Sequence, residues 1–431
     1  MLANGTKKVP PANVVLPHYA FGAVSFFVLT VLMFFSVTSF TRHYFSPELL
    51  SITHVAVLGW ICMVIFGALY QLLPVILLSE LFSNTLARIT FVFFATGVVF
   101  LAYAFWNFLV GFTLQIASLL LLIAIGLFCT NIYLTAKKAV EVKTEGEFII
   151  TSAIWFLVTA VIGVLLVFNF THPFLPTDHL VYLKLHSHIG FAGWLILLVI
   201  GVSSKLIPMF LLSSEVSAKK LKLSYYFINA ALLGFLVDTL VFCSTTRAII
   251  YFVIAVIGIL FYLSFIYEVY KCRARKNSDI GMKHSLLAFL FVFVPIISGC
   301  FVHGNVLGNE IYAMRLTLLY GASVVIGFLS LLILGQTFKT LPFIVWLHKY
   351  GKLAGKGKTP LPKDLFSDQI ARLQFIGFVT AYPVLLIGIG LGKPVVIQAA
   401  CLLLIITALL YNINVFKIIL HKTKFENYKT N

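Results

Sequence analysis

Residues 184–212 read KLHSHIGFAGWLILLVIGVSSKLIPMFLL, an apolar segment of helix length that carries two histidines near its start. Two other stretches follow the same pattern: THVAVLGWICMVIFGALYQLLP at 53–74 and GASVVIGFLSLLILGQTFKTLP at 321–342. The first glycine, the aromatic residue after it, the second glycine and the proline keep the same offsets in all three copies, and successive copies are 134 residues apart. This regularity predicts an internal threefold repeat.

The composition places the chain in a membrane. Of its 431 residues, 61% are hydrophobic and only 10% are charged, whereas about a quarter of the residues of a soluble domain are charged. Twelve apolar runs are long enough to span a bilayer, which takes roughly 20 residues. They lie at about 17–40, 49–79, 88–107, 111–135, 147–170, 180–212, 223–243, 248–270, 284–303, 312–338, 371–391 and 394–419. We therefore expect an all-α integral membrane protein of twelve transmembrane helices.

Repeat and spans together predict the domain organisation. The twelve helices form three pseudo-equivalent four-helix repeats, at about 17–136, 147–270 and 284–419, within a single membrane domain over 1–431. No soluble domain is expected.

Basic residues orient the helices. With the N-terminus inside, the outside segments hold only four basic residues, Arg42, Arg247, Arg315 and Lys393. The positive-inside rule then puts both termini in the cytoplasm, and we expect a multi-pass protein of the bacterial inner (plasma) membrane. The net charge of +17 follows from this bias, so the predicted partner of the basic loops is membrane lipid and not nucleic acid.

Three of the eleven histidines lie within second helices of the repeats. His54 and His188 occupy the same repeat position and should share one membrane depth, and His186 lies two residues before His188. Two imidazoles at one depth on related helices suit bis-histidine ligation of a haem iron. The competing interpretation is that each is a core histidine bonded to backbone or hydroxyl groups. For the histidines on the cytoplasmic side, His18, His284, His348 and His421, we expect interfacial roles.

The spacing of His186 and His188 predicts two sites. Positions i and i+2 of a helix point about 200° apart, so the two rings cannot easily share one metal. His186 would then ligate a second haem, ligate a copper ion, or hold another ligand in place through a hydrogen bond. His303, at the outer end of helix nine, is the candidate partner in membrane depth.

Other residues of the pattern each have two interpretations. The repeated glycines allow either close helix approach or room for a flat macrocycle. Trp60 and Trp194 fit packing better than contact with a ring edge. Lys205 and Lys339 are expected to snorkel to the headgroups. Asp238, in the apolar part of helix seven, is either functional or bonded to a neighbouring helix.

The chain resembles subunit I of the haem-copper oxidase superfamily, which includes nitric oxide reductases. The segment from His54 through FGALYQLLP is similar to that family's second helix, and LHSHIGFAGW is similar to its H-x-H-x-x-F-x-G motif. The resemblance implies that His54 and His188 ligate a low-spin haem b and that His186 is the axial ligand of a second haem. It implies one haem b or two, with copper open as a further cofactor.

The sequence departs from that family in two places. Its H-x-H helix belongs to the second repeat, where the family has it in the third, and the third repeat has Ala322 at that position. Helix seven contains no histidine, so the His-His copper pair of the family has no counterpart. The NnrS family, haem- and copper-containing membrane proteins linked to nitric oxide tolerance, is a more distant similarity.

We therefore expect a haem-binding membrane redox protein with a degenerate copper site. It would transfer electrons or reduce a small diatomic, NO or O₂, as an oxidoreductase. Cytochrome c, quinol or another membrane subunit would deliver electrons, while the haem carries the chemistry. The alternative is a non-catalytic haem or copper carrier, an assembly factor or a nitrosative-stress protein, with His172 and His179 as further exchangeable ligands. A solute transporter is a third interpretation, because repeats are common in transporters.

Overall fold

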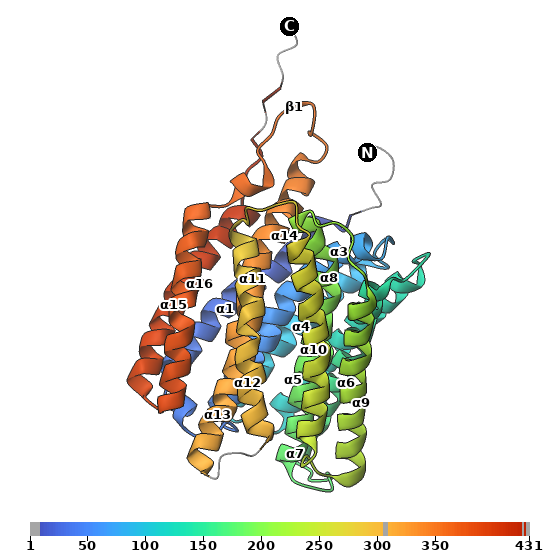
Figure 1. Cartoon of the computed structure of the whole chain (residues 1–431). Coiled ribbons are helices and arrows are strands. Elements are labelled where there is room, and N and C mark those ends of the chain that lie inside the picture. The colour runs from blue at the N-terminus through green and yellow to red at the C-terminus, as the bar shows by residue number, and fades with distance from the viewer. Residues whose placement is uncertain (1–8, 305–308, 425, 428–431) are drawn as a thin grey trace. The chain divides into compact units, whose positions relative to one another are not determined.

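The computed structural model describes residues 9–304, 309–424, 426 and 427, and within them the chain is almost entirely helical (Figure 1). Twelve helices are long and apolar enough to cross a membrane. They are Ala12–Phe35, Pro47–Ile76, Asn84–Trp106, Phe112–Lys137, Thr144–Asn169, His179–Leu211, Lys219–Phe242, Ala248–Lys271, Ile280–His303, Glu310–Tyr350, Asp368–Leu391 and Pro394–Ile419. The expected fold class, an all-α membrane protein of twelve helices, is confirmed.

Eight spans are single α-helices. They are α1 (Ala12–Phe35), α4 (Asn84–Trp106), α5 (Phe112–Lys137), α6 (Thr144–Asn169), α9 (Lys219–Phe242), α10 (Ala248–Lys271), α15 (Asp368–Leu391) and α16 (Pro394–Ile419). The other four are composite. They consist of α2 (Pro47–His54), η2 (Val55–Cys62) and α3 (Met63–Ile76); α7 (His179–His188), η3 (Ile189–Ile196) and α8 (Leu197–Leu211); α11 (Ile280–Phe291) and α12 (Phe293–His303); and α13 (Glu310–Ala322), η4 (Ser323–Ser330) and α14 (Leu331–Tyr350). Short connecting elements are η1 (Ser39–Thr41), η5 (Pro362–Leu365) and the antiparallel pair β1 (Gly357–Lys358) and β2 (Glu426–Asn427).

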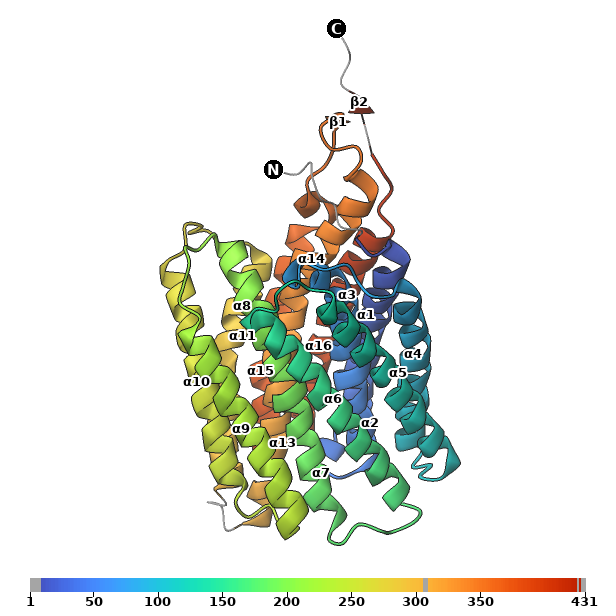
Figure 2. The ribbon, with the colours of Figure 1, turned by 90° about the vertical axis from the view of Figure 1, so that its right-hand side faces the viewer.

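The chain divides into two compact units. The first comprises 1–9, 72–278 and 299–306, and the second comprises 10–71, 279–298 and 307–431. In the first unit α4 packs on α5, α6 packs on η3 and α8, and α9 packs on α10 (Figure 2). In the second unit α15 packs on α16, α1 on α16, α11 on α14, and η2 contacts η4.

The middle segment of three composite spans is a π-helix. The segments η2, η3 and η4 begin at Val55, Ile189 and Ser323, each directly after the repeat position held by His54, His188 and Ala322. A π-helix adds a residue to each turn, is rare, and is frequent at functional sites. Three such segments at one repeat position show that the threefold repeat in the sequence is a repeat in backbone structure.

The repeat extends to the packing of the first helix of each quartet. Phe26 of α1 stacks on Trp60 with ring centroids 4.6 Å apart, and Phe156 of α6 stacks on Trp194 at 4.3 Å. In the third quartet Phe289 of α11 lies 6.3 Å from Phe328. In each quartet, the aromatic residue after the first glycine of the repeated segment (Trp60, Trp194 or Phe328) therefore packs against a phenylalanine of the quartet's first helix.

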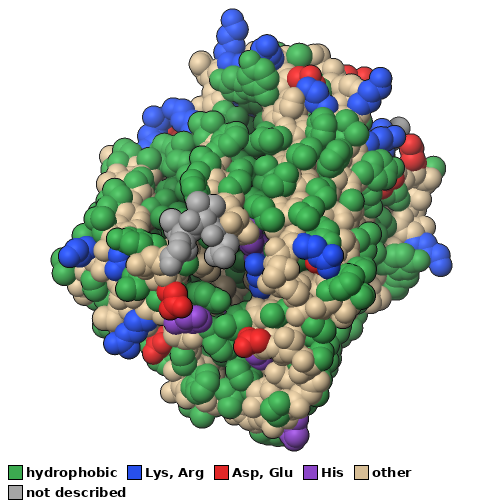
Figure 3. All heavy atoms as spheres, turned by 60° about the horizontal axis from the view of Figure 1, so that its bottom comes forward, with side chains coloured by type: hydrophobic (Ala, Val, Ile, Leu, Met, Phe, Trp, Pro, Cys, Tyr) green, Lys and Arg blue, Asp and Glu red, His purple; other side chains and the backbone are tan. Residues whose placement is uncertain are grey.

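Apolar side chains cover much of the molecular surface. Figure 3 shows one face, where hydrophobic side chains dominate and charged ones are scattered between them. Exposed residues of the spans include Val92, Val237 and Val253. An apolar exterior on helices that satisfy their own backbone hydrogen bonds is what a hydrocarbon environment requires. The chain is a multi-pass membrane protein.

The second glycine of the repeated segment, which is Gly335 in the third copy, lets the first two helices of the quartet pack in direct contact. A Cβ on Gly335 would lie 2.4 Å from His284 Cβ and 2.7 Å from the carbonyl oxygen of Gly281. We expect Gly335→Ala to lower the stability of the detergent-solubilised protein by about 1–3 kcal/mol because the two helices must separate. Gly321→Ala is the matched control, since a Cβ there meets no heavy atom within 4 Å. Thermal unfolding that gives both variants the same midpoint would contradict this expectation.

Candidate functional site

His54 and His188 adopt one side-chain geometry. His54 Nδ1 lies 2.7 Å from the carbonyl oxygen of Leu50, and His188 Nδ1 lies 2.7 Å from that of Lys184. A carbonyl oxygen only accepts, so Nδ1 is the protonated nitrogen of each ring. In the neutral imidazole the lone pair is then on Nε2, which is the tautomer that a metal-ligating histidine needs. Both residues are set for ligation through Nε2 by their own helices.

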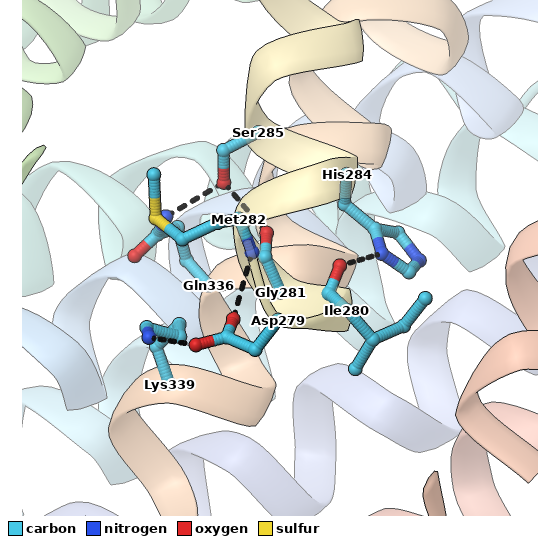
Figure 4. A network of polar contacts seen from close by, with 8 residues as sticks. All are labelled: Asp279, Ile280, Gly281, Met282, His284, Ser285, Gln336 and Lys339. Atoms are coloured by element: carbon cyan, nitrogen blue, oxygen red, sulfur yellow. Dashed lines mark hydrogen bonds and ion pairs between the residues drawn. The ribbon is translucent and has the colours of Figure 1, made fainter. Parts of the chain in front are cut away.

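Two buried histidines share this geometry at other positions. His18 Nδ1 donates to the carbonyl of Val14 at 2.9 Å, and His284 Nδ1 donates to that of Ile280 at 2.8 Å, as Figure 4 shows for His284. Both side chains are fully buried inside the protein. They lie against Gly67 and Gly335, where the helices approach most closely.

The second ring nitrogen of His284 also faces a protein side chain, as that of His188 does. The side-chain amide of Gln374 lies 3.4 Å from His284 Nε2, so both nitrogens of this ring face partners from the protein. The bond from Nδ1 to the preceding turn is therefore necessary for ligation through Nε2 but is not sufficient for it. We assign His284 to packing of the helix interface.

His186 faces its neighbouring helix α6. Its Nδ1 lies 3.0 Å from the carbonyl oxygen of Thr159, and its ring lies over Gly163, whose Cβ would be 2.9 Å from His186 Cε1. His188 instead contacts Phe235 of α9, with ring centroids 5.9 Å apart. The two rings thus contact different helices, as the spacing of two residues predicts.

His303, the last residue of α12, lies against His188. The two Nε2 atoms are 3.1 Å apart, and Phe252 of α10 lies 4.9 Å from the His303 ring. Only 8% of His303 is exposed. The sequence suggested His303 as a partner for the His186 side, whereas the structure places it on the opposite side of the helix, with His188.

Trp60 and Trp194 pack in the core. Each indole stacks on a phenylalanine of its own quartet, and Trp60 Nε1 donates to Ser330 Oγ at 3.0 Å. Trp60 and Trp194 are 0% and 1% exposed. These contacts favour the packing interpretation over contact with a macrocycle.

Two charged residues of the spans, Asp238 and Lys339, form ion pairs. Asp238 pairs with Arg247, whose guanidinium also lies over the ring of Phe242. Lys339 pairs with Asp279 at 2.6 Å and its side chain is only 12% exposed, whereas the side chain of Lys205 is exposed. Asp238 therefore matches the interpretation of a bond to a neighbouring element, and Lys339 is held inside the protein by an ion pair.

Comparisons with known proteins point to one fold. No protein-family model matches the sequence, and no curated protein matches it. A solved structure described as a "heme-copper terminal oxidase dimer" matches with a TM-score of 0.68 and 10% sequence identity over 97% of this chain and 86% of that one. The chain has the fold of a heme-copper terminal oxidase. The resemblance seen in the two histidine segments therefore extends over the whole chain as architecture.

A heme-copper oxidase fold implies a haem and a copper ion, and the residues fit these two groups unequally. His54, in the second unit, and His188, in the first, each have the tautomer that a haem iron needs. For copper, α9 holds no histidine, and among residues 9–304 and 309–424 no group of three or more His, Cys, Asp or Glu side chains is placed to hold a metal. Each of the two histidines is by itself suited to ligate a haem iron, whereas the described residues do not supply the copper site of that family.

Proposed function

We propose that the chain is a haem-binding membrane redox protein in which His54 and His188 ligate a low-spin haem b. The observation that carries the proposal is the shared geometry of the two residues. Each occupies the same repeat position, precedes a π-helical segment and has its Nδ1 proton fixed by a carbonyl of the preceding turn. Such outer-shell bonds orient a ligand and raise its basicity.

The chain's own residues would bind and orient the cofactor. His54 and His188 provide nitrogen lone pairs, and the surrounding apolar helices provide a low-dielectric setting that tunes the redox potential. When bound, the haem supplies one-electron transfer. His186 would serve a second haem or act as an outer-shell residue, since its Nδ1–H is likewise bonded to a carbonyl.

The proposal includes an orientation and a reaction. With both termini in the cytoplasm of a bacterial cell, as the basic loops predict, a quinol, a cytochrome c or another subunit would deliver electrons. The haem would then pass its electrons to a partner protein or use them to reduce NO or O₂. The absence of the family's His-His pair from α9 favours electron transfer over oxygen reduction at a haem–copper centre.

A second candidate function is that of a haem or copper carrier. The observation that favours it is the contact between His188 Nε2 and His303 Nε2, because it gives His188 a partner other than haem. The carrier would bind its cargo without redox turnover. Exposed His172 would be a further exchangeable ligand.

A reduced-minus-oxidised visible spectrum with pyridine haemochrome analysis tests the proposal on the purified, full-length protein. After haem-sufficient expression, we expect the bands of a low-spin haem b at one haem per chain or two. Reoxidation of the reduced protein by NO or O₂ with turnover would identify an enzyme, and haem that exchanges without turnover would identify a carrier. A colourless protein would overturn the proposal.

A further inference from the structure

Two imidazoles from different helices converge in the first unit. His188 is the last residue of α7 and His303 the last of α12, and their rings are 4.9 Å apart between centroids at an interplanar angle of 67°. Their Nε2 atoms are the atoms that meet, 3.1 Å apart. Because the two residues are 115 positions apart in sequence, the fold itself brings these two nitrogens together.

Two ring nitrogens at this distance need either a proton or a cation between them, because two lone pairs repel each other. His188 holds its proton on Nδ1, which donates to the carbonyl of Lys184, so His188 Nε2 provides a lone pair. His303 Nε2 then either carries a proton toward that lone pair or provides a second lone pair to the same point. We propose that the second arrangement is the metal-bound state, in which His188 and His303 bind a divalent metal cation of the zinc class.

Binding needs no net release of a proton. When the cation takes the place between the two nitrogens, the His303 proton moves from Nε2 to Nδ1, and both rings remain neutral. Neutral imidazole is the form that ligates zinc. One new bond forms from each Nε2 to the cation, and the N–H···N hydrogen bond is lost.

The distance between the two Nε2 atoms indicates the coordination geometry of the bound cation. With metal–nitrogen bonds of about 2.0–2.1 Å, nitrogens at the observed separation enclose an angle of about 100° at the metal, close to tetrahedral. A linear two-coordinate ion would hold them about 4 Å apart, twice one bond length. The separation of 3.1 Å therefore suits zinc and not a linear ion.

The surroundings make the site exchangeable. In the described part of the chain no third His, Cys, Asp or Glu joins the pair, so water or an added ligand would fill the remaining positions. Phe235 and Phe252 flank the rings, and Lys184 lies one helical turn before His188 on α7. The nearby ammonium opposes a cation, so the affinity should be below that of a closed structural zinc site.

This inference goes beyond the proposed function and does not need haem. His188 Nε2 has one lone pair, so a haem iron and a zinc ion exclude each other there. Zinc would therefore bind the haem-free chain and block haem uptake at His188.

The test is a titration of the full-length, haem-free protein in detergent with Zn²⁺, and with Co²⁺ as a spectroscopic probe. We expect the titration to saturate at one Zn²⁺ per chain, and the intense visible bands of tetrahedral Co²⁺. His188→Ala and His303→Ala should each weaken binding at least about tenfold, since a single imidazole remains. His43→Ala, which removes an exposed histidine, is the matched control and should bind as the wild type does.

A variant that should bind more tightly guards against effects of misfolding. Lys184→Gln removes the opposing charge and should tighten Zn²⁺ binding by about tenfold, which a damaged protein would not show. Full zinc binding in His303→Ala, or Co²⁺ spectra of octahedral type only, would overturn the inference. A colourless protein that binds zinc would overturn only the haem proposal, and a haem protein whose haem-free form binds no zinc would overturn only this one.

Discussion

His54→Ala and His188→Ala are each expected to abolish the low-spin haem b spectrum, while the protein still folds and inserts. A low-spin haem needs two strong axial ligands, and alanine provides none. The third repeat supplies no replacement imidazole at this position, because it has Ala322 there. Visible spectra of the reduced variants, at equal protein, measure the effect.

Two controls make this expectation specific. His284→Ala removes a buried histidine with the same Nδ1 bond, and His43→Ala removes an exposed one, so both variants should keep the haem spectrum. His186→Ala should keep the low-spin bands and lose about half of the pyridine haemochrome only if His186 ligates a second haem. An unchanged spectrum in both His54→Ala and His188→Ala would rule out the proposed ligand pair.

The repeat could be predicted from the sequence, but its backbone consequence could not. Offsets of 134 residues place His54, His188 and Ala322 at one position, and the twelve spans follow from apolar length. The π-helical segments depend on one added residue per turn, and the apolar residues around them show no period that distinguishes π from α. The threefold aromatic contact with the first helix was also hidden, because Phe26, Phe156 and Phe289 are not evenly spaced.

Membrane depth could be read from the sequence, whereas lateral position could not. The charge pattern and helix order placed His303 at a suitable depth, but the rotation of α12 decides which histidine it meets, and that is His188. Similarly, His18 and His284 are near the ends of apolar segments in sequence, yet both are fully buried. Their burial follows from close packing at Gly67 and Gly335, which a single sequence does not specify.

The end of the tenth span was predicted too early because Lys339 has an ion-pair partner that the sequence does not show. The tenth apolar run ends at 338, just before Lys339, but the span continues through Pro342 to Tyr350. Figure 4 shows why the lysine is accommodated: Asp279 at the start of α11 pairs with Lys339, and Gln336 of α14 donates to Ser285 of α11. A charge with a partner on the adjacent helix does not end a helix in the membrane.

This ion pair leads to the second large expected effect, a loss of stability in Asp279→Ala. Asp279 has two roles: its Oδ1 accepts from the backbone N–H of Met282 and caps α11, and its Oδ2 pairs with Lys339. Losing the cap costs about 1 kcal/mol. Leaving a largely buried ammonium without this carboxylate costs several kcal/mol when both groups are buried, and less here because 35% of the Asp279 side chain is exposed. We expect a total of about 2–4 kcal/mol in denaturant or thermal unfolding in detergent.

Asp279→Asn separates the two roles, because its amide oxygen keeps the cap while the negative charge is lost. It should destabilise the protein by about 1–2 kcal/mol, less than alanine. Lys339→Met then removes the charge that has lost its partner and replaces it with an apolar side chain of similar length. Because a buried pair can be replaced by apolar residues at little cost, the double variant Asp279→Asn/Lys339→Met should be more stable than Asp279→Asn alone. A double variant that is less stable than either single variant would show that Lys339 has a role in the second unit beyond its pairing with Asp279.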